Sequence, residues 1–214
     1  MPLARNFPSL RLPRTRSLPL ALALGLLLTS GCRPSSAEKA KAPETPKSSG
    51  GLHASMETDK GTIDIEFLPE MAPKAVENFR LLAERGYYKG VIFHRVVKGF
   101  MIQGGDPTGT GRGGESAFGG VFPDEINRSS VVYQRGYRRG IVAMANSGPN
   151  TNGSQFFIMH QDYPLRPNYV IFGHVTKGME VVDTIAEAPT SMGNDGDTSK
   201  PLTPVAIRGI KILP

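Results

Sequence analysis

The 214-residue sequence contains one cysteine, no tryptophan and no long hydrophobic run. A single cysteine excludes an internal disulfide, so the folded chain must be stabilised by packing. The most apolar stretch, Leu18–Leu28 (LPLALALGLLL), has only eleven residues. A helix needs ~20 apolar residues to cross the hydrocarbon core of a bilayer, so this stretch is too short for a permanent membrane span.

The chain also lacks a charge excess outside its N-terminal part. The formal net charge is +6, and residues 1–51 account for all of it, with eight Lys/Arg against two acidic residues. Residues 52–214 hold 17 basic and 17 acidic residues and are neutral overall. A neutral globular part has no basic surface to steer it onto phosphate groups. We therefore expect no nucleic-acid partner.

Residues 1–31 have the order of a secretory signal peptide. Basic residues between Arg5 and Arg16 precede the apolar stretch, and small residues follow it. The ending Leu28–Cys32 (LTSGC) resembles a bacterial lipoprotein signal, in which the cysteine is lipidated and becomes the new N-terminus. Thr29 departs from that pattern, which usually has an aliphatic residue there. We expect a lipid anchor on Cys32 that holds the protein at a membrane outside the bacterial cytoplasm; ordinary secretion, with Cys32 incidental, is the alternative.

A linker separates this signal from the folded domain. Residues 33–51 (RPSSAEKAKAPETPKSSGG) are rich in Pro, Ser, Ala and Lys and have hardly an apolar side chain. Such a segment cannot bury enough surface to offset the entropy lost on ordering. Residues 32–51 are therefore predicted to be the lipidated cysteine with a disordered linker, and residues 52–214 to be one folded domain.

Within the domain, short alternating segments are separated by turn residues, and two segments have helical spacing. The expected strands are His53–Thr58, Thr62–Phe67, Val91–Val97, Phe100–Gln103, Ile141–Ala145, Gln155–Met159, Val170–Val175 and Val205–Ile212, and the expected helices are Ala72–Arg85 and Gly178–Ala188. Many short strands with two isolated helices predict a mainly β fold, an antiparallel barrel capped by helices, rather than alternating βαβ units.

Three patterns that suggest other functions are incomplete. Gly109–Ser116 nearly matches a phosphate-binding loop, but Glu115 stands where a lysine should reach the phosphate. Asn194–Asp197 resembles the start of a calcium loop, but the downstream bidentate glutamate is missing, which favours a simple turn. The four histidines have no ligand spacing. The sequence therefore predicts neither a nucleotide site nor a metal site.

The residues that are candidates for catalysis or binding lie in two segments: Phe93–Asp106 (FHRVVKGFMIQGGD) and Met144–Ile158 (MANSGPNTNGSQFFI). The first alternates like a strand, so Phe93, Arg95 and Val97 are expected on one face. An arginine among apolar neighbours in mid-strand needs a partner or a function. Together the segments place an arginine, soft apolar side chains and glutamines on adjacent strands, with no acid, thiol or metal-ligand cluster among these side chains. This set suits an apolar pocket with a few fixed donors, not covalent chemistry.

These two segments resemble the signature stretches of the cyclophilin family of peptidyl-prolyl cis-trans isomerases, and the similarity extends from about Met56 to about Ile212. The resemblance implies a closed eight-stranded antiparallel β-barrel with a helix over each end. It implies that Arg95 is the catalytic arginine, that proline-containing polypeptides are the partners and that no cofactor is needed. The substrate-binding residues that it implies are Phe100, Met101, Gln103, Ala145, Asn146, Gln155, Phe157, Leu165 and Tyr169.

The chain departs from many eukaryotic members at two positions beside this pocket. Pro164 stands where those members have a tryptophan next to the pocket leucine, and Tyr169 stands where they have a histidine. An indole offers a broad apolar face and an N–H donor, whereas proline offers no donor. The resemblance implies isomerase activity on X-Pro bonds, which we expect to act on unfolded or flexible exported proteins. Pro164 predicts that cyclosporin binds weakly. The alternative is a scaffold or holdase that grips proline peptides without turnover.

Overall fold

A computed structural model describes residues 51–214 of the chain. The predicted signal peptide, Cys32 and most of the predicted linker lie outside these described residues. Within residues 51–214, none of the helices has the length and apolar character that crossing a membrane would require.

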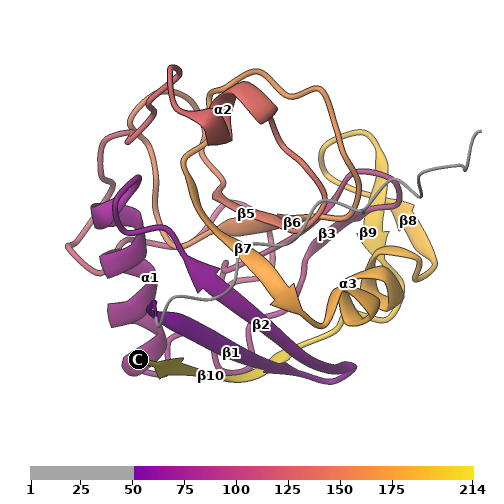
Figure 1. The fold of residues 1–214 in the computed structure, drawn as a ribbon. Coiled ribbons are helices and arrows are strands. Elements are labelled where there is room, and N and C mark those ends of the chain that lie inside the picture. Colours follow the sequence, from indigo (N-terminus) through magenta and orange to yellow (C-terminus); the bar gives the residue numbers. More distant parts are fainter. Residues whose placement is uncertain (1–50) are drawn as a thin grey trace, which may run out of the picture. The chain divides into compact units, whose positions relative to one another are not determined.

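The centre of the domain is one eight-stranded antiparallel sheet that curls around an apolar core (Figure 1). Across the sheet the strands are β10 (Ile207–Leu213), β1 (His53–Thr58), β2 (Gly61–Phe67), β7 (Ile171–Lys177), β5 (Ile141–Met144), β6 (Phe156–Met159), β4 (Met101–Gly104) and β3 (Arg95–Val97). The mainly β, antiparallel character expected from the sequence is confirmed. No ladder joins the outer strands β10 and β3 within residues 51–214, so the observed sheet is a curled sheet, not a fully paired barrel.

The segment that was expected to be one strand, Val91–Val97, is divided. Ile92 forms an isolated bridge with Ala206, and the Phe93 N–H donates to the Val205 carbonyl at 3.0 Å. From Arg95 onward the chain pairs with β4 instead. Because the chain changes partner here, its alternation is interrupted: Phe93 and Val96 both lie in the main core. The prediction that Phe93 shares a face with Arg95 and Val97 is therefore wrong.

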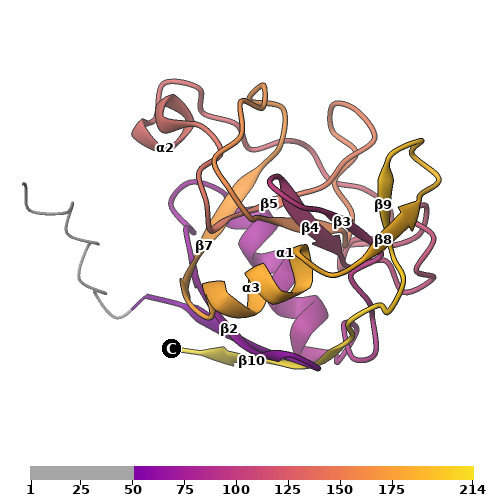
Figure 2. The same cartoon turned by 90° about the vertical axis from the view of Figure 1, so that its right-hand side faces the viewer.

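The two predicted helices lie at opposite ends of the curled sheet (Figures 1 and 2). They are α1 (Pro73–Glu84) and α3 (Met179–Ala186). Pro73 starts α1 because its fixed φ suits a first helical position. The carboxylate of Glu125 accepts from the Lys74 and Ala75 N–H groups at 3.0 and 2.9 Å, so a distant residue satisfies the helix N-terminus.

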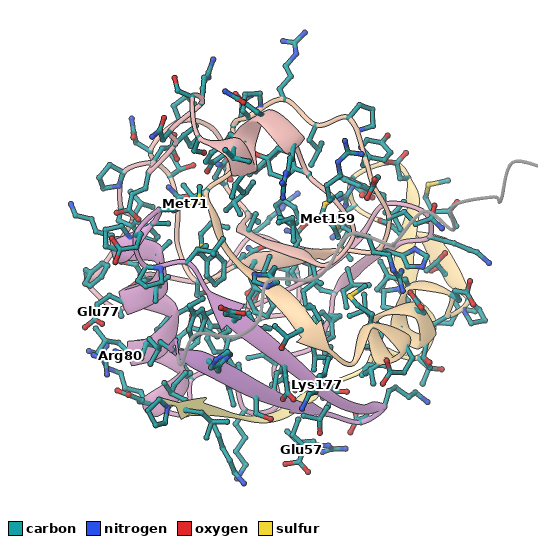
Figure 3. All side chains as sticks on the ribbon, viewed as in Figure 1. Glu57, Met71, Glu77, Arg80, Met159 and Lys177 are labelled. Atoms are coloured by element: carbon teal, nitrogen blue, oxygen red, sulfur yellow. The ribbon has the colours of Figure 1, made fainter. Side chains whose placement is uncertain are left out.

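The outer face of α1 is polar. Arg80 donates to Glu77 at 2.8 Å and to Glu84 at 2.7 Å, and the side chains of Glu77 and Arg80 lie side by side at the surface (Figure 3). Pairs at this spacing stabilise an exposed helix modestly. The inner face of α1 instead packs Val76, Phe79 and other small or apolar side chains into the core.

Two elements were not expected from the sequence. Helix α2 (Val131–Arg135) is a short turn of helix capped by Ser130, whose Oγ accepts from the Tyr133 N–H. A separate hairpin pairs β8 (Thr190–Met192) with β9 (Thr198–Pro201). Residues 193–197 connect these two strands, so the prediction of a turn at Asn194–Asp197 is confirmed. The hairpin lies next to β3 (Figure 2), which carries Arg95.

Apolar side chains form two clusters on the two faces of the sheet region. The main core contains Phe79, Phe93 and Phe172 together with residues of α1 and α3. A second, smaller cluster is built on Met101, Phe157 and Met159 and includes two tyrosines of the α2 region, Tyr133 and Tyr137; Met159 lies near the middle of the view in Figure 3. The second cluster supports the candidate site.

Candidate functional site

Arg95 lies in a row of side chains that crosses three strands. Arg95 on β3 is the register partner of Gln103 on β4, and Gln103 is the register partner of Phe157 on β6. Directly opposed residues of antiparallel strands project to the same face of the sheet. The pairing therefore brings together three of the predicted site residues, which are 62 positions apart at most in the sequence.

The predicted apolar residues gather beside this row. Met101 and Phe157 are 1% and 4% exposed, whereas Phe100, Leu165 and Tyr169 are partly exposed at the edge of the same cluster. The rings of Phe157 and Tyr169 meet edge to face, with centroids 5.4 Å apart. A buried floor with a partly exposed apolar rim can receive a small apolar group from solvent.

The two glutamines of the site form a chain of hydrogen bonds. The Gln103 Nε2 donates to Gln155 Oε1 at 2.9 Å. The Gln155 Nε2 then donates to the Gly113 carbonyl at 2.8 Å and to the Gly111 carbonyl at 3.1 Å. Because Gln155 is held at both ends of its amide, it fixes Gln103 and ties the sheet to the glycine-rich loop that follows β4.

That loop is organised around a buried carboxylate. Asp106 accepts from the N–H groups of Thr108, Gly111 and Gly113 at 2.8, 2.7 and 3.1 Å. Burial alone would raise the pKa of Asp106, but hydrogen bonds from Thr108, Gly113 and Gly111 outweigh it and lower the pKa to about 2. The near match to a phosphate-binding loop thus has a different structural role, since its N–H groups bind the protein's own carboxylate.

Ala145 and Asn146 close the site on the β5 side. The Ala145 N–H donates to the Gln155 carbonyl at 3.0 Å. The Asn146 Nδ2 donates to the Asn168 carbonyl at 2.9 Å, which attaches the segment that carries Leu165 and Tyr169. The side chain of Asn146 is therefore engaged within the protein.

An acid that the sequence analysis did not include contacts Arg95. The Arg95 Nε donates to Asp195 Oδ2 at 2.6 Å, and Asp197 Oδ2 lies 3.9 Å from Arg95 Nη2. This acid lies outside both motif segments, so their side chains gave no sign of it. Burial would raise the pKa of Asp195, but hydrogen bonds from Arg95 and Ser199 lower it to about 2. The turn at 194–197 was visible in the sequence, but its position against β3 was not.

Three tyrosines were also missed. The hydroxyls of Tyr133 and Tyr137 donate to the Tyr169 carbonyl at 3.2 and 2.8 Å, and the Tyr169 N–H donates back to the Tyr137 hydroxyl at 3.1 Å. Burial raises the pKa of Tyr133 to about 12. The third, Tyr163, packs its ring against Phe100 with centroids 4.3 Å apart. The buried pair fixes Tyr169 from behind, while Tyr163 extends the rim of the apolar cluster.

Two surface cavities meet at Gln103. One of about 380 Å³ is lined by Arg95, Gln103 and the hairpin residue Asp195, among others. The other, of about 320 Å³, is lined by Gln103, Asn146 and Gln155 with residues of the glycine-rich loop. Gln103 therefore borders both cavities. Within residues 51–214, no three His, Cys, Asp or Glu side chains gather as a metal site would require.

Comparisons with known proteins agree with this geometry. Residues 53–212 match the family described as "Cyclophilin type peptidyl-prolyl cis-trans isomerase/CLD". "Peptidyl-prolyl cis-trans isomerase-like 3" of Homo sapiens is 46% identical over 162 residues, which cover 75% of this chain and 96% of the human protein. "Peptidyl-prolyl cis-trans isomerase CYP18-2" of Arabidopsis thaliana is 45% identical over 159 residues, covering 74% of this chain and 92% of the plant protein.

Solved structures give the same result. The crystal structure of a cyclophilin type peptidyl-prolyl cis-trans isomerase from Cryptosporidium parvum has a TM-score of 0.69 and 42% identity, covering 76% of this chain and 98% of that chain. The same parasite protein, solved in the presence of the dipeptide Ala-Pro, has a TM-score of 0.68. With the family match over residues 53–212, these findings assign the chain to the cyclophilin-type peptidyl-prolyl cis-trans isomerases, enzymes that accelerate rotation about X-Pro bonds.

Proposed function

We propose that Arg95 is the catalytic donor of this isomerase. The observation that carries the proposal is the row of Arg95, Gln103 and Phe157 across β3, β4 and β6, which places the one charged donor of the row beside an apolar floor. The carbon Cζ of Arg95 lies 5.8 Å from the Phe100 ring centroid, and Nη1 lies 3.8 Å from Met101 Sδ. The guanidinium therefore borders the surface on which a proline ring would sit.

The chemistry requires only a positioned donor. Nitrogen donates its lone pair into the carbonyl of an X-Pro amide, which leaves a rotation barrier of ~18–20 kcal/mol. In the twisted transition state that donation is lost, so the prolyl nitrogen becomes pyramidal and basic. A guanidinium N–H aimed at this nitrogen stabilises the twisted form more than either planar form, which lowers the barrier. No covalent bond forms or breaks in this step.

The other site residues are proposed to hold the substrate. Phe100, Met101, Phe157 and Leu165 would contact the proline ring, and Tyr169 would support Phe157. Gln103 and the backbone of Asn146 would fix the peptide on either side, with Ala145 and Gln155 shaping the second cavity. The carbonyl before the proline would then be free to rotate. The dipeptide Ala-Pro used with the Cryptosporidium protein has the chemistry that such a site would accept.

Turnover on a proline peptide tests this assignment. The purified protein should catalyse cis-trans isomerisation of a short X-Pro peptide, measured by exchange NMR between the two isomers. Chemical-shift changes on peptide addition should centre on Gln103, Asn146 and Phe157. Peptide binding without faster exchange would instead support a scaffold or holdase.

We further propose that the protein works outside the bacterial cytoplasm on exported polypeptides, anchored by a lipid on Cys32. The support is the sequence alone: the basic and apolar order of residues 1–31, the single cysteine and the linker after it. One acyl chain binds membranes only marginally, so firm anchoring would need several chains. Cys32→Ala should move the protein from the membrane fraction to the soluble fraction, or leave an uncleaved precursor. Wild-type protein that is soluble and lipid-free by mass spectrometry would contradict the proposal.

We also propose that the outer segments of the sheet complete a barrel in solution. The backbone around residues 91–93 already contacts residues 205–207, through the Phe93 bond to Val205 and a 2.9 Å bond from the Ile207 N–H to the Val91 carbonyl. If this contact closes the sheet, these two amides should exchange as slowly as those of β1. Fast exchange at both would show that the sheet stays open.

A further inference from the structure

The contact between Arg95 and Asp195 joins the proposed catalytic group to a part of the chain with no assigned role. We propose that Asp195 is a positioning residue for Arg95: its carboxylate fixes the guanidinium in the orientation that the reaction uses. This inference rests on the proposed role of Arg95. It makes the β8–β9 hairpin part of the active site, although the hairpin supplies none of the expected substrate-binding residues.

The carboxylate is itself held in place. Its Oδ1 accepts from Ser199 Oγ at 2.7 Å and from the Asp197 N–H at 3.2 Å, and Ser199 is only 2% exposed. Gly193 allows this close arrangement, because a Cβ there would lie 2.3 Å from Ser199 Oγ and 2.6 Å from Asp195 Oδ1. Oδ1 is thus bound within the hairpin, and Oδ2 is left for Arg95.

The bond to Asp195 also determines which edge of the guanidinium remains available. Asp195 takes the Nε–H of Arg95, while Nη1 lies next to Met101 and the guanidinium carbon faces the Phe100 ring. Nη1 is therefore directed to the apolar surface proposed for proline, while Nη2 lies 3.9 Å from Asp197 Oδ2. Arginine has several rotatable bonds, and a small misplacement of a catalytic group is costly in rate. Fixing Nε reduces that freedom.

The charge of Asp195 has an opposing effect, because a carboxylate partly neutralises the guanidinium that must stabilise the transition state. The two side chains are each 27% exposed and line a surface cavity. Solvent screens their mutual attraction, so its electrostatic cost to the reaction should be small. The orientation that the hydrogen bond imposes should therefore outweigh the charge effect, and removing Asp195 should slow the reaction.

The first test is turnover of Asp195 variants. Asp195→Ala should lower kcat about fivefold, or about 1 kcal/mol of barrier, with little change in KM, since the apolar contacts to proline remain. Asp195→Asn should lose about twofold, because the single amide oxygen cannot accept from both Arg95 and the Asp197 N–H. Ser199→Ala should also lower kcat, because it removes a hydrogen bond that holds the Asp195 carboxylate in place.

A matched control separates positioning from stability. Asp59 also pairs with an arginine, Arg208, and also accepts from a backbone N–H, that of Ala206 at 2.9 Å. Its side chain is 26% exposed, close to that of Asp195. Asp59→Ala should change stability as much as Asp195→Ala but leave kcat unchanged. Asp197→Ala removes the more distant carboxylate and should cost less than Asp195→Ala.

A spectroscopic measurement follows the guanidinium directly. The Nε–H signal of Arg95 should be observable and slowly exchanging in the wild type, and broadened or lost in Asp195→Ala. In an Arg95→Lys background, which lacks Nε–H, adding Asp195→Ala should cost little more turnover. Unchanged or faster kcat in folded Asp195→Ala, or an equal loss in Asp197→Ala, would overturn the proposal; if Asp195→Ala fails to fold, Asp195→Asn and Ser199→Ala decide it. Full turnover in Arg95→Ala would instead refute the role of Arg95.

Discussion

The ring of Tyr163 packs against the ring of Phe100, with centroids 4.3 Å apart and planes tilted by 33°. Tyr163 is 44% exposed, so one side of Phe100 is covered by a ring that itself remains partly open to solvent. It precedes Pro164, the position at which many family members have a tryptophan. The rim of the proposed proline pocket therefore retains an aromatic ring although the chain has no tryptophan.

Removing the Tyr163 ring should lower kcat/KM. An aromatic pair contributes ~0.5–1.5 kcal/mol beyond its buried area, so Tyr163→Ala should lower kcat/KM roughly two- to tenfold. Tyr163→Phe keeps the packing and should stay within about twofold of wild type. Both can be compared by peptide isomerisation kinetics. A larger loss in Tyr163→Phe than in Tyr163→Ala would show that the hydroxyl, not the ring, matters.

Arg95 should account for most of the rate enhancement. A donor used mainly in the transition state contributes ~10²–10³ in rate, and Arg95→Ala should lose about that much turnover while the domain stays folded by circular dichroism. Arg95→Lys should be nearly as slow, because a flexible ammonium replaces the planar fork and cannot reproduce the Nε contact to Asp195. A folded Arg95→Ala protein that keeps more than about a third of the turnover would contradict this, since so small a loss is well under 1 kcal/mol.

Cyclosporin should inhibit this protein less than it inhibits members with the tryptophan. Pro164 is exposed and has no N–H to donate. Pro164→Trp would add both a broad apolar face and a donor next to Leu165, and should tighten inhibition about tenfold or more. Inhibition constants for wild type and Pro164→Trp measure the difference. A wild-type affinity equal to that of tryptophan-bearing members would refute the prediction.

The Asp106 carboxylate should make stability depend on pH on the acid side. Its pKa is about 2 in the folded protein and 3.8 ordinarily, so its stabilising contribution is present above pH 3.8 and is lost as the pH falls towards 2. Asp106→Asn should lower the free energy of unfolding at neutral pH by roughly 2 kcal/mol, because an amide N–H₂ would face backbone donors. The substitution should also make the free energy of unfolding depend less on pH in the acid range. Urea unfolding between pH 2 and pH 7 measures both.

Several features of the fold can be predicted from local sequence. The turn at Asp59–Gly61 sets the β1–β2 hairpin, and the spacing of Val76, Phe79 and Leu82 gives α1 its buried face. The polar turn within Met144–Ile158 predicts that the short apolar runs on either side of it pair with each other, as β5 and β6 do. In each case the decisive interactions are between near neighbours or depend on side-chain periodicity.

Other contacts were decided only by the tertiary structure. Asp195 meets Arg95 from 100 positions away, Glu125 caps α1 from 50 positions beyond Ala75, and Tyr137 fixes Tyr169 from a loop with little regular structure. No periodicity links these pairs, since each contact depends on how far the sheet curls and where a connecting loop crosses it. The sequence by itself determines which groups can do the chemistry; the long-range packing determines which edge of Arg95 remains free to do it, because a hydrogen-bond partner can orient a side chain only after the fold has brought the two together.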